Sequence, residues 1–237
     1  KGLDLVVTQY SLLFNNDALL DIKALGEFER TFKDKPKAAI LGAKLLNPDR
    51  TLQNSIAEFP HILQEIVKLN KYRGVDFNQT TKVESVIGAC LAINMKTLKI
   101  IGKLDEDFFF FLEETEFCYR ATNMGYDVYY IPTAVAIHAQ GGTANKFKSL
   151  ARIEFQRSKL IYYRKTKGII IWPMVSLILI IKSLVNFSSN LILFLLTAGL
   201  NNKFKMKTVG YFKILLWHIL FRPSSWGLPN KCRSESS

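Results

Sequence analysis

The chain has 237 residues, long enough for one good-sized domain and an appendage, and its 32 Lys and Arg against 20 Asp and Glu give a formal net charge of +12. Residues 1–150 carry 18 basic and 18 acidic side chains whereas residues 151–237 carry 14 and 2, an imbalance that favours an anionic partner, either a nucleic acid or a lipid surface. The 3 cysteines are odd in number and form no CxxC pair or Cys/His cluster, which indicates a reducing compartment and no structural zinc site.

The first fifty residues have the pattern of an α/β domain. The apolar run Tyr10–Phe14 predicts a buried strand that ends at the polar sequence NND. Residues 18–33 carry apolar side chains at helical spacing and stop before Pro36, which predicts a helix. A second strand is expected over Ala38–Leu46, followed by the turn NPDR. Strand, helix and strand at these connection lengths are typical of α/β domains.

The following residues extend this pattern to residue 150. Val83–Asn94 predicts a strand interrupted at Gly88, where the backbone can approach another group closely. A helix is expected in the acidic sequence behind the aromatic run Phe108–Phe111, ending at Gly125, a residue type that caps helices in the left-handed conformation. The sequences YDVYYIP and AVAIHA predict two more strands. A basic amphipathic helix over about residues 147–165 then leads into the tail.

The tail, residues 151–237, contains an apolar stretch from Gly168 to Leu200 whose only charge is Lys182. Basic residues bracket this stretch, as they do in membrane segments and not in nucleic-acid-binding arms. About 33 residues are too many for one straight span of about 20 and too few for two spans with a turn. We expect either a helix in the membrane interface, broken at Pro173, or an embedded hairpin or tilted span; buried helices of a soluble core are the other alternative. The interfacial alternative rests on one polar stripe, formed by Lys182, Ser183, Asn186, Ser189 and Asn190.

Glu114 is the first candidate for chemistry. On a helical wheel it shares an apolar face with Phe117 and Cys118, whereas Glu113 and Glu116 lie on another face. A carboxylate among apolar side chains has either a partner or a raised pKa, and both are common where a carboxylate handles protons. The alternative is an acid in the first turn of a helix, where the helix dipole favours negative charge.

Two further candidates follow predicted strands. Asp17 would lie beyond the carboxyl end of the first strand, where the ligands of open α/β sheets gather, and a carboxylate there can hold a divalent cation that offsets the charge of a diphosphate. His138, at the end of a late strand, can complete the coordination of the same metal. The structural alternatives are a polar turn of the kind that follows most strands and a histidine with a structural role in its strand.

In this order, the sequences LLFNND, ILGAKLLNPDRTLQNS and the long block from Val86 to Thr143 closely resemble the family-2 glycosyltransferases of the GT-A fold. The resemblance covers about residues 2–165 and is strongest to the rhamnosyltransferase-like enzymes of bacterial surface polysaccharide synthesis. It implies an α/β fold with the mixed, Rossmann-like GT-A sheet in residues 1–150, expected to lack its N-terminal nucleotide-binding half. Membrane-associated helices are expected in residues 151–237.

The same resemblance assigns roles to individual residues. Glu114 matches the second acid of the family's acidic pair, which is the catalytic base. Asn15 replaces the first acid often found in the family's DxD-type motif, and Lys96 stands where relatives often carry an Arg, which binds phosphate with a different geometry. The cofactor is expected to be a divalent cation, Mg or Mn. The residues assigned to donor binding are Asn15, Asp17, Gly88, Ala89, Asp105 and Glu106, and those assigned to the metal are Asp17 and His138.

The sequence therefore predicts an inverting glycosyltransferase at the cytoplasmic face of the cell membrane. Its partners would be a nucleoside-diphosphate sugar, a lipid-linked glycan acceptor of cell-surface polysaccharide synthesis, and the membrane surface. A nucleic acid is not expected as a partner, because the tail lacks the polar aromatic residues interleaved with Arg that nucleic-acid-binding surfaces use. The alternative is a catalytically incompetent, truncated remnant that acts as a membrane-associated glycan-binding or interaction protein.

Overall fold

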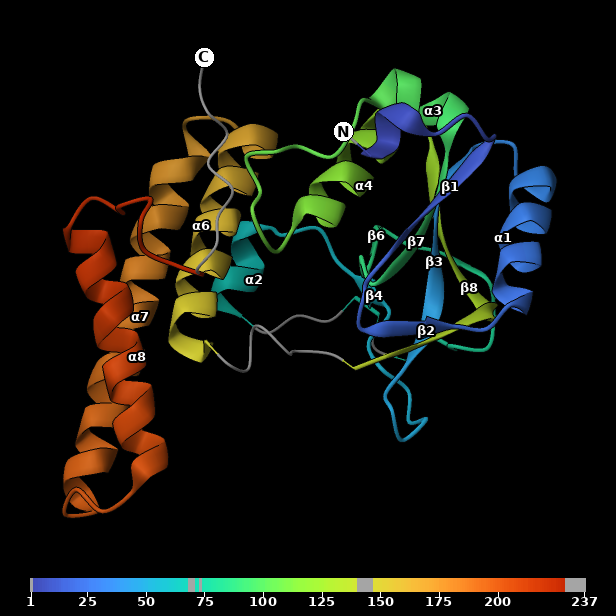
Figure 1. Cartoon of the computed structure of the whole chain (residues 1–237). Helices are drawn as coiled ribbons and strands as arrows, with labels where there is room; N and C mark the ends of the chain where they lie inside the picture. Colours follow the sequence, from blue (N-terminus) through green and yellow to red (C-terminus); the bar gives the residue numbers. More distant parts are fainter. Residues whose placement is uncertain (1, 68–70, 73, 140–146, 229–237) are drawn as a thin grey trace. The chain divides into compact units, whose positions relative to one another are not determined.

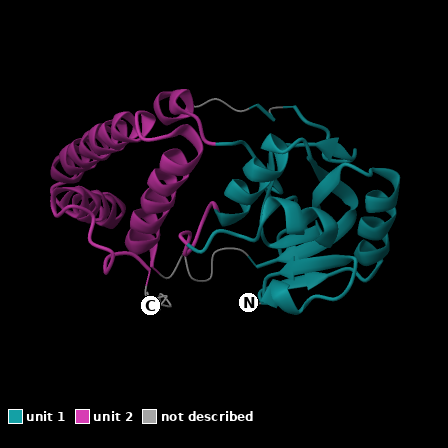
Figure 2. Cartoon of the chain, turned by 90° about the horizontal axis from the view of Figure 1, so that it is seen from above, with its two compact units in different colours: residues 1–59, 69–106, 113–140 teal, residues 60–68, 107–112, 141–237 magenta. Residues whose placement is uncertain are grey.

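The computed structural model describes residues 2–67, 71–72, 74–139 and 147–228. These residues form two compact units, drawn in different colours in Figure 2. The first unit contains an α/β sheet domain and the second contains a group of helices. The first unit comprises residues 1–59, 69–106 and 113–140, and the second comprises residues 60–68, 107–112 and 141–237.

The first unit is built on a 6-stranded mixed sheet of order β1-β7-β3-β8-β2, with β5 paired to β8 off this path. The two longest strands, β3 and β8, are parallel to each other, and the other pairs are antiparallel. The predicted α/β class with a mixed sheet is thus confirmed. The strands are β1 (Tyr10–Phe14), β2 (Ala18–Leu20), β3 (Ala38–Leu46), β5 (Thr81–Lys82), β7 (Cys90–Asn94) and β8 (Asp127–His138), and a separate pair is formed by β4 (Ile56–Ala57) and β6 (Ser85–Val86).

Helices cover both faces of this sheet, with α1 on one side and α3 and α4 on the other (Figure 1). Alternate residues of β3 point to the two faces, so that Ile40 packs with Phe117 of α4 while Leu41 packs with Phe28 of α1. Each helix buries its apolar stripe against the sheet, which is the usual way such a core forms. The helices of this unit are the short 3-10 helix Gly2–Leu5, α1 (Lys23–Asp34), α3 (Met95–Ile101) and α4 (Glu113–Asn123).

Three predicted elements differ from those observed. The helix predicted over residues 18–33 begins only at Lys23, because Ala18–Leu20 pair with the end of β8 as a strand. The sequences YDVYYIP and AVAIHA form the single strand β8, whose pairing with β3 shifts between Ile131 and Val135, on either side of Pro132. A proline has no N–H to donate, and strand prolines are therefore found at such irregular positions. Val83–Asn94 forms two strands in different sheets, separated around Gly88.

The second unit consists of helices around a core that includes Trp217, Tyr163 and Val175. The predicted break at Pro173 is wrong, since α7 runs without interruption and Pro173 lies in its first turn, where the missing N–H has no intrahelical partner to lose. Among the described residues α7 is the one helix long and apolar enough to cross a membrane, and only 17% of its apolar window is buried. The helices are α2 (Ile62–Ile66), α6 (Lys148–Lys167), α7 (Ile171–Leu196) and α8 (Asn202–Ile219).

The polar stripe predicted for α7 is turned partly inward within this unit. Ser183 and Asn190 are buried, and Gln156 of α6 donates a hydrogen bond to Ser183 Oγ at 3.1 Å. Lys182 donates to the carbonyl of Glu65 at 3.0 Å. Large apolar side chains are exposed instead. Val175 and Leu179 of the same helix are buried in the core of the unit, so α7 has apolar side chains both in the core and on the surface.

Candidate active site

The sequence NND after β1 and the end of β8 form the first part of the site. Ala18 and His138 are register partners, and the N–H of Ala139 donates to the carbonyl of Asp17 at 3.0 Å. This pairing brings two predicted metal ligands together, with 3.3 Å between Asp17 Oδ1 and His138 Nε2. Nδ2 of Asn15 lies 3.5 Å from the same ring nitrogen. Short strand β2, which replaces the start of the predicted helix, is thus what places Asp17 beside the histidine.

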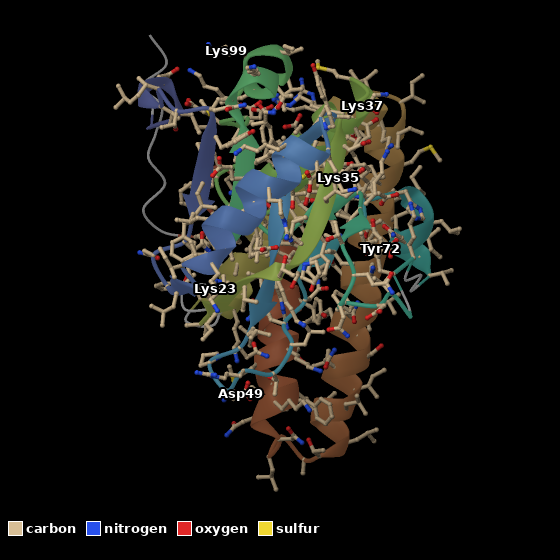
Figure 3. All side chains as sticks on the ribbon, turned by 90° about the vertical axis from the view of Figure 1, so that its right-hand side faces the viewer. Lys23, Lys35, Lys37, Asp49, Tyr72 and Lys99 are labelled. Carbon is tan, nitrogen blue, oxygen red and sulfur yellow. The ribbon has the colours of Figure 1, made fainter. Side chains whose placement is uncertain are left out.

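Gln53 holds the other side of the imidazole ring. The chain turns after β3, at the loop marked by Asp49 in Figure 3, and comes back so that the N–H of Gln53 donates to the carbonyl of Leu45 at 2.9 Å. The buried side chain places its Oε1 2.8 Å from His138 Nδ1. Its Nε2 donates to Asn47 Oδ1 at 2.9 Å and to the carbonyl of His138 at 3.1 Å. Sequence reasoning missed Gln53, because a single amide in a turn region has no periodicity or charge signal.

The donors around His138 suit a divalent cation. Because Nε2 of Gln53 faces two oxygen acceptors, its Oε1 accepts a hydrogen bond from Nδ1–H of His138. In a neutral ring of this tautomer the lone pair lies at Nε2, beside Asp17. An imidazole nitrogen and a carboxylate oxygen are donors that Mn²⁺ accepts. Within the described residues no group of three His, Cys, Asp or Glu could hold a metal. A cation here would take its remaining ligands from substrate phosphates and water, as Mg²⁺ often does.

The Gly88 segment links this pair to Glu114. The N–H of Asn15 donates to the carbonyl of Ala89 at 3.0 Å, which fixes the end of β1 against the segment. On the other side, Gly88 faces Glu114, and an added Cβ would stand 3.5 Å from the Cβ and Cγ atoms of the glutamate, an ordinary van der Waals distance. The close backbone approach expected at this glycine is therefore not found, because the structure leaves room for a methyl group between the two residues. Contacts therefore run from Asp17 and His138 through Asn15 to Ala89, and the adjoining Gly88 faces Glu114.

Glu114 is half-buried in the first turn of α4, one turn before Phe117 and Cys118, which are fully buried. Burial and the neighbouring Glu113 carboxylate raise the pKa of Glu114 to about 7. Burial also raises the pKa of Glu113, whose Oε2 has no hydrogen-bond partner among the described residues. The hydroxyl of Thr115 donates weakly to Glu114 Oε1 at 3.3 Å. Glu114 therefore lies in the first turn of a helix and has a raised pKa, while its role in handling a proton stays a prediction.

The backbone directly before α4 is strained. Phe111 and Leu112 have φ angles of 70° and 66°, in the left-handed region that residues other than glycine rarely adopt. Such conformations cost free energy and are concentrated at functional sites. They end the aromatic run and turn the chain directly into the helix that begins at Glu113.

Asp105 and Glu106, which the resemblance assigns to donor binding, lie on the loop between α3 and α4. Arg120 of α4 donates to the carbonyls of Ile101 and Lys103 and to Glu116, so the start of this loop is held against the helix. Glu106 is exposed and Asp105 is half-buried. The assignment of Asp105 and Glu106 to donor binding stays a prediction.

Comparison with known proteins gives one partial sequence match. No protein-family model matches the chain. Over 67 residues the sequence is 36% identical to the low-salt glycan biosynthesis hexosyltransferase Agl10 of Haloferax volcanii, a match that covers 28% of this chain and 22% of that relative. The structure of GalNAc-T7 with UDP, GalNAc and Mn²⁺ aligns with a TM-score of 0.44 and 11% identity, over 68% of this chain and 35% of that one, a likeness too weak to assign a fold. The sequence relationship is thus to a glycosyltransferase, and the family-2 and rhamnosyltransferase details stay predictions.

Proposed function

We propose that the chain carries the catalytic groups of an inverting, family-2 glycosyltransferase of the rhamnosyltransferase-like group. It would move a hexosyl or rhamnosyl residue from a nucleoside-diphosphate sugar to a hydroxyl of a glycan acceptor. The observation that carries this proposal is the position of Glu114, whose carboxyl group has a pKa of about 7 and faces Gly88. The segment that contains Gly88 is joined through Asn15 to Asp17 and His138. The partial match to a hexosyltransferase of glycan biosynthesis supports the same class of reaction.

In the proposed reaction Glu114 is the general base. Its carboxylate takes the proton of the acceptor hydroxyl while the oxygen attacks the anomeric carbon from the face opposite the diphosphate, which leaves with the bonding electron pair. A base is most effective when its pKa lies near the working pH, since it is then largely deprotonated and still a good proton acceptor. Asp17 and His138 would hold Mg²⁺ or Mn²⁺, which offsets the charge of the leaving diphosphate. Gly88 and Ala89 would border the sugar and the acceptor.

The acceptor is proposed to be lipid-linked and to be reached at the cytoplasmic face of the cell membrane. The support is the second unit, where α7 turns Ser183 and Asn190 inward and large apolar side chains outward. A helix in lipid pairs its polar groups internally in this way. Basic side chains before α7 and at the start of α8 would add attraction to anionic lipid headgroups. The exposed apolar side chains of α7 include Leu177, Ile181, Leu184, Val185, Ile192 and Leu195.

A transfer assay tests the catalytic part of this proposal. The full chain is incubated with Mn²⁺, a panel of radiolabelled nucleoside-diphosphate sugars and a membrane lipid extract, and the label in the lipid fraction is counted. We expect one donor to label the lipid fraction, and the label to disappear with Glu114→Gln. Glycan binding by the full chain without transfer from any donor would support the non-catalytic alternative.

Flotation with liposomes tests the membrane part. The full chain should float with vesicles that contain anionic lipid, and 1 M salt should release only part of it, because salt screens charges but does not weaken apolar insertion. Replacing Leu177, Ile181 and Leu184 together by Gln should reduce the salt-resistant fraction. The matched control replaces Ile22 and Leu25, exposed apolar residues of the first unit, in the same way. Complete release by salt would show docking by charge alone.

A further inference from the structure

The side chain of Gln53 makes two hydrogen bonds with His138. It bonds to the imidazole at Nδ1, 2.8 Å away, and to the carbonyl of the same residue at 3.1 Å. It thereby holds the ring and the backbone of His138 at the same time. A third bond, to Asn47 Oδ1 at 2.9 Å, uses the remaining amide hydrogen of Gln53. Both the position of the ring and the orientation of the amide are therefore fixed.

We propose that Gln53 is a positioning residue that holds His138 in the Nδ1–H tautomer and so presents the Nε2 lone pair beside Asp17 as a preformed, two-residue site for a divalent cation. The inference rests on the proposed function only for the identity of the cation. Gln53 itself contacts neither the cation nor the substrate. Its role is to orient a ligand, as the outer partners of metal-binding histidines do.

The arrangement disfavours the other neutral tautomer of His138. With the proton on Nε2, the lone pair of Nδ1 would face Oε1 of Gln53, which places two acceptors 2.8 Å apart. Turning the amide of Gln53 to avoid this would point its oxygen at two other oxygens, Asn47 Oδ1 and the carbonyl of His138. Buried polar groups are rarely left without a hydrogen bond, so the network selects one tautomer. Asn15 Nδ2, 3.5 Å from Nε2, is a further donor that faces the lone pair.

Nitrogen NMR of the full chain tests the tautomer directly. The chain has only 3 histidines, so the spectrum of protein labelled with ¹⁵N-histidine is simple, and the peaks lost in His138→Gln assign the residue. At pH 8 we expect a protonated Nδ1 and an unprotonated Nε2 for His138. Added Mn²⁺ should broaden the His138 signals before those of His61. A protonated Nε2, either in the other tautomer or in an imidazolium paired with Asp17, would overturn the proposal.

Substitution of Gln53 tests its role. Gln53→Met removes the acceptor at Nδ1 with little change in volume, and we expect a mixture of His138 tautomers and a 10–100-fold loss of Mn²⁺ affinity. Gln53→Leu also lacks the acceptor and is a second variant should Gln53→Met fail to fold. The matched control is Gln156→Met, because Oε1 of Gln156 lies 2.8 Å from His218 Nε2 in the second unit. It should leave Mn²⁺ affinity unchanged.

An unchanged tautomer and unchanged Mn²⁺ affinity in folded Gln53→Met would refute the positioning role. Neither readout depends on sugar transfer. A failure here is therefore separate from a failure of the proposed function, which is tested by transfer with and without Glu114.

Discussion

The backbone of Gly88 lies against the side chain of Glu114, with room for a Cβ atom 3.5 Å from the Cβ and Cγ and 3.8 Å from the Cδ of the glutamate. These distances are ordinary van der Waals contacts. A single methyl group therefore fits at Gly88, whereas a longer side chain would have to occupy the place of the Glu114 carboxyl group. The contact joins the predicted donor-binding segment to the predicted base.

Substitutions at Gly88 should separate activity from stability. Gly88→Ala should fold with a stability change within about 0.5 kcal/mol, as for a tolerated substitution. Gly88→Leu should displace the Glu114 carboxyl group and lower the transfer rate at least about 10-fold, equal to about 1.4 kcal/mol of transition-state stabilisation. Thermal unfolding and initial transfer rates measure the two effects. Equal transfer rates in the Leu variant and the unsubstituted chain would mean that Gly88 does not border the reacting groups.

The matched control is Gly42, in the central strand β3. A Cβ there would stand 2.4 Å from the Cβ of Val86, which is far closer than two carbon atoms approach. Gly42→Ala should therefore cost about 1–3 kcal/mol of unfolding free energy, as overpacked cores do. Equal stability of the Gly42→Ala and Gly88→Ala variants would show that Gly42 of β3 is not packed against Val86 of β6.

The rate of transfer should depend on pH through Glu114. A general base acts in its deprotonated form, so kcat/KM should rise as pH increases through about 7, the pKa of Glu114, and level off above it. Burial is the first cause of this raised pKa and the charge of Glu113 is the second. Glu113→Gln removes that charge, and the midpoint of the profile should move to lower pH. A midpoint that moves upward, or a profile that is flat between pH 5 and 9, would contradict the role of Glu114.

The second unit contains a buried ion pair that should be sensitive to removal of one partner. Glu65 is 3% exposed, and Lys159 Nζ lies 2.7 and 2.8 Å from its two oxygens. Lys159→Met leaves this carboxylate with two longer contacts, the Tyr163 hydroxyl at 3.4 Å and Lys182 Nζ at 3.8 Å, and should cost about 3–5 kcal/mol. The control Lys33→Met, which breaks the exposed pair with Glu29, should cost about 0–1 kcal/mol. Denaturant unfolding of the full chain measures the loss of unfolding free energy in each variant. Equal losses in Lys159→Met and Lys33→Met would show that Glu65 is not buried.

Local sequence patterns predicted much of the fold. Two strands and one helix were predicted close to where they are observed: β1 and β3 from their apolar runs, and α1 from the helical spacing that precedes Pro36. Each pattern reports which side chains face the core. The raised pKa of Glu114 followed for the same reason, since its apolar neighbours on the helical wheel are the buried Phe117 and Cys118.

Features that depend on distant partners were missed. Ala18–Leu20 fits a helical pattern but pairs with the end of β8, far along the chain, and that pairing decides its conformation. Gln53 acts only through its distance to His138, which no local pattern encodes. The polar stripe of α7 was predicted to form the exposed face of an interfacial helix, whereas Ser183 of that stripe accepts a hydrogen bond from Gln156 of α6. In each case tertiary contacts overrode or completed the local preference.

The exchange Glu114→Gln tests the central claim most directly. Glutamine keeps the size of the side chain but cannot accept the proton of the acceptor hydroxyl, so transfer should fall about 10²–10⁴-fold while the Kd of the donor, measured by calorimetry with Mn²⁺, stays the same. Donor binding at the normal Kd with transfer lost is the predicted result. Transfer at the normal rate by the folded variant would contradict the claim that Glu114 is the base.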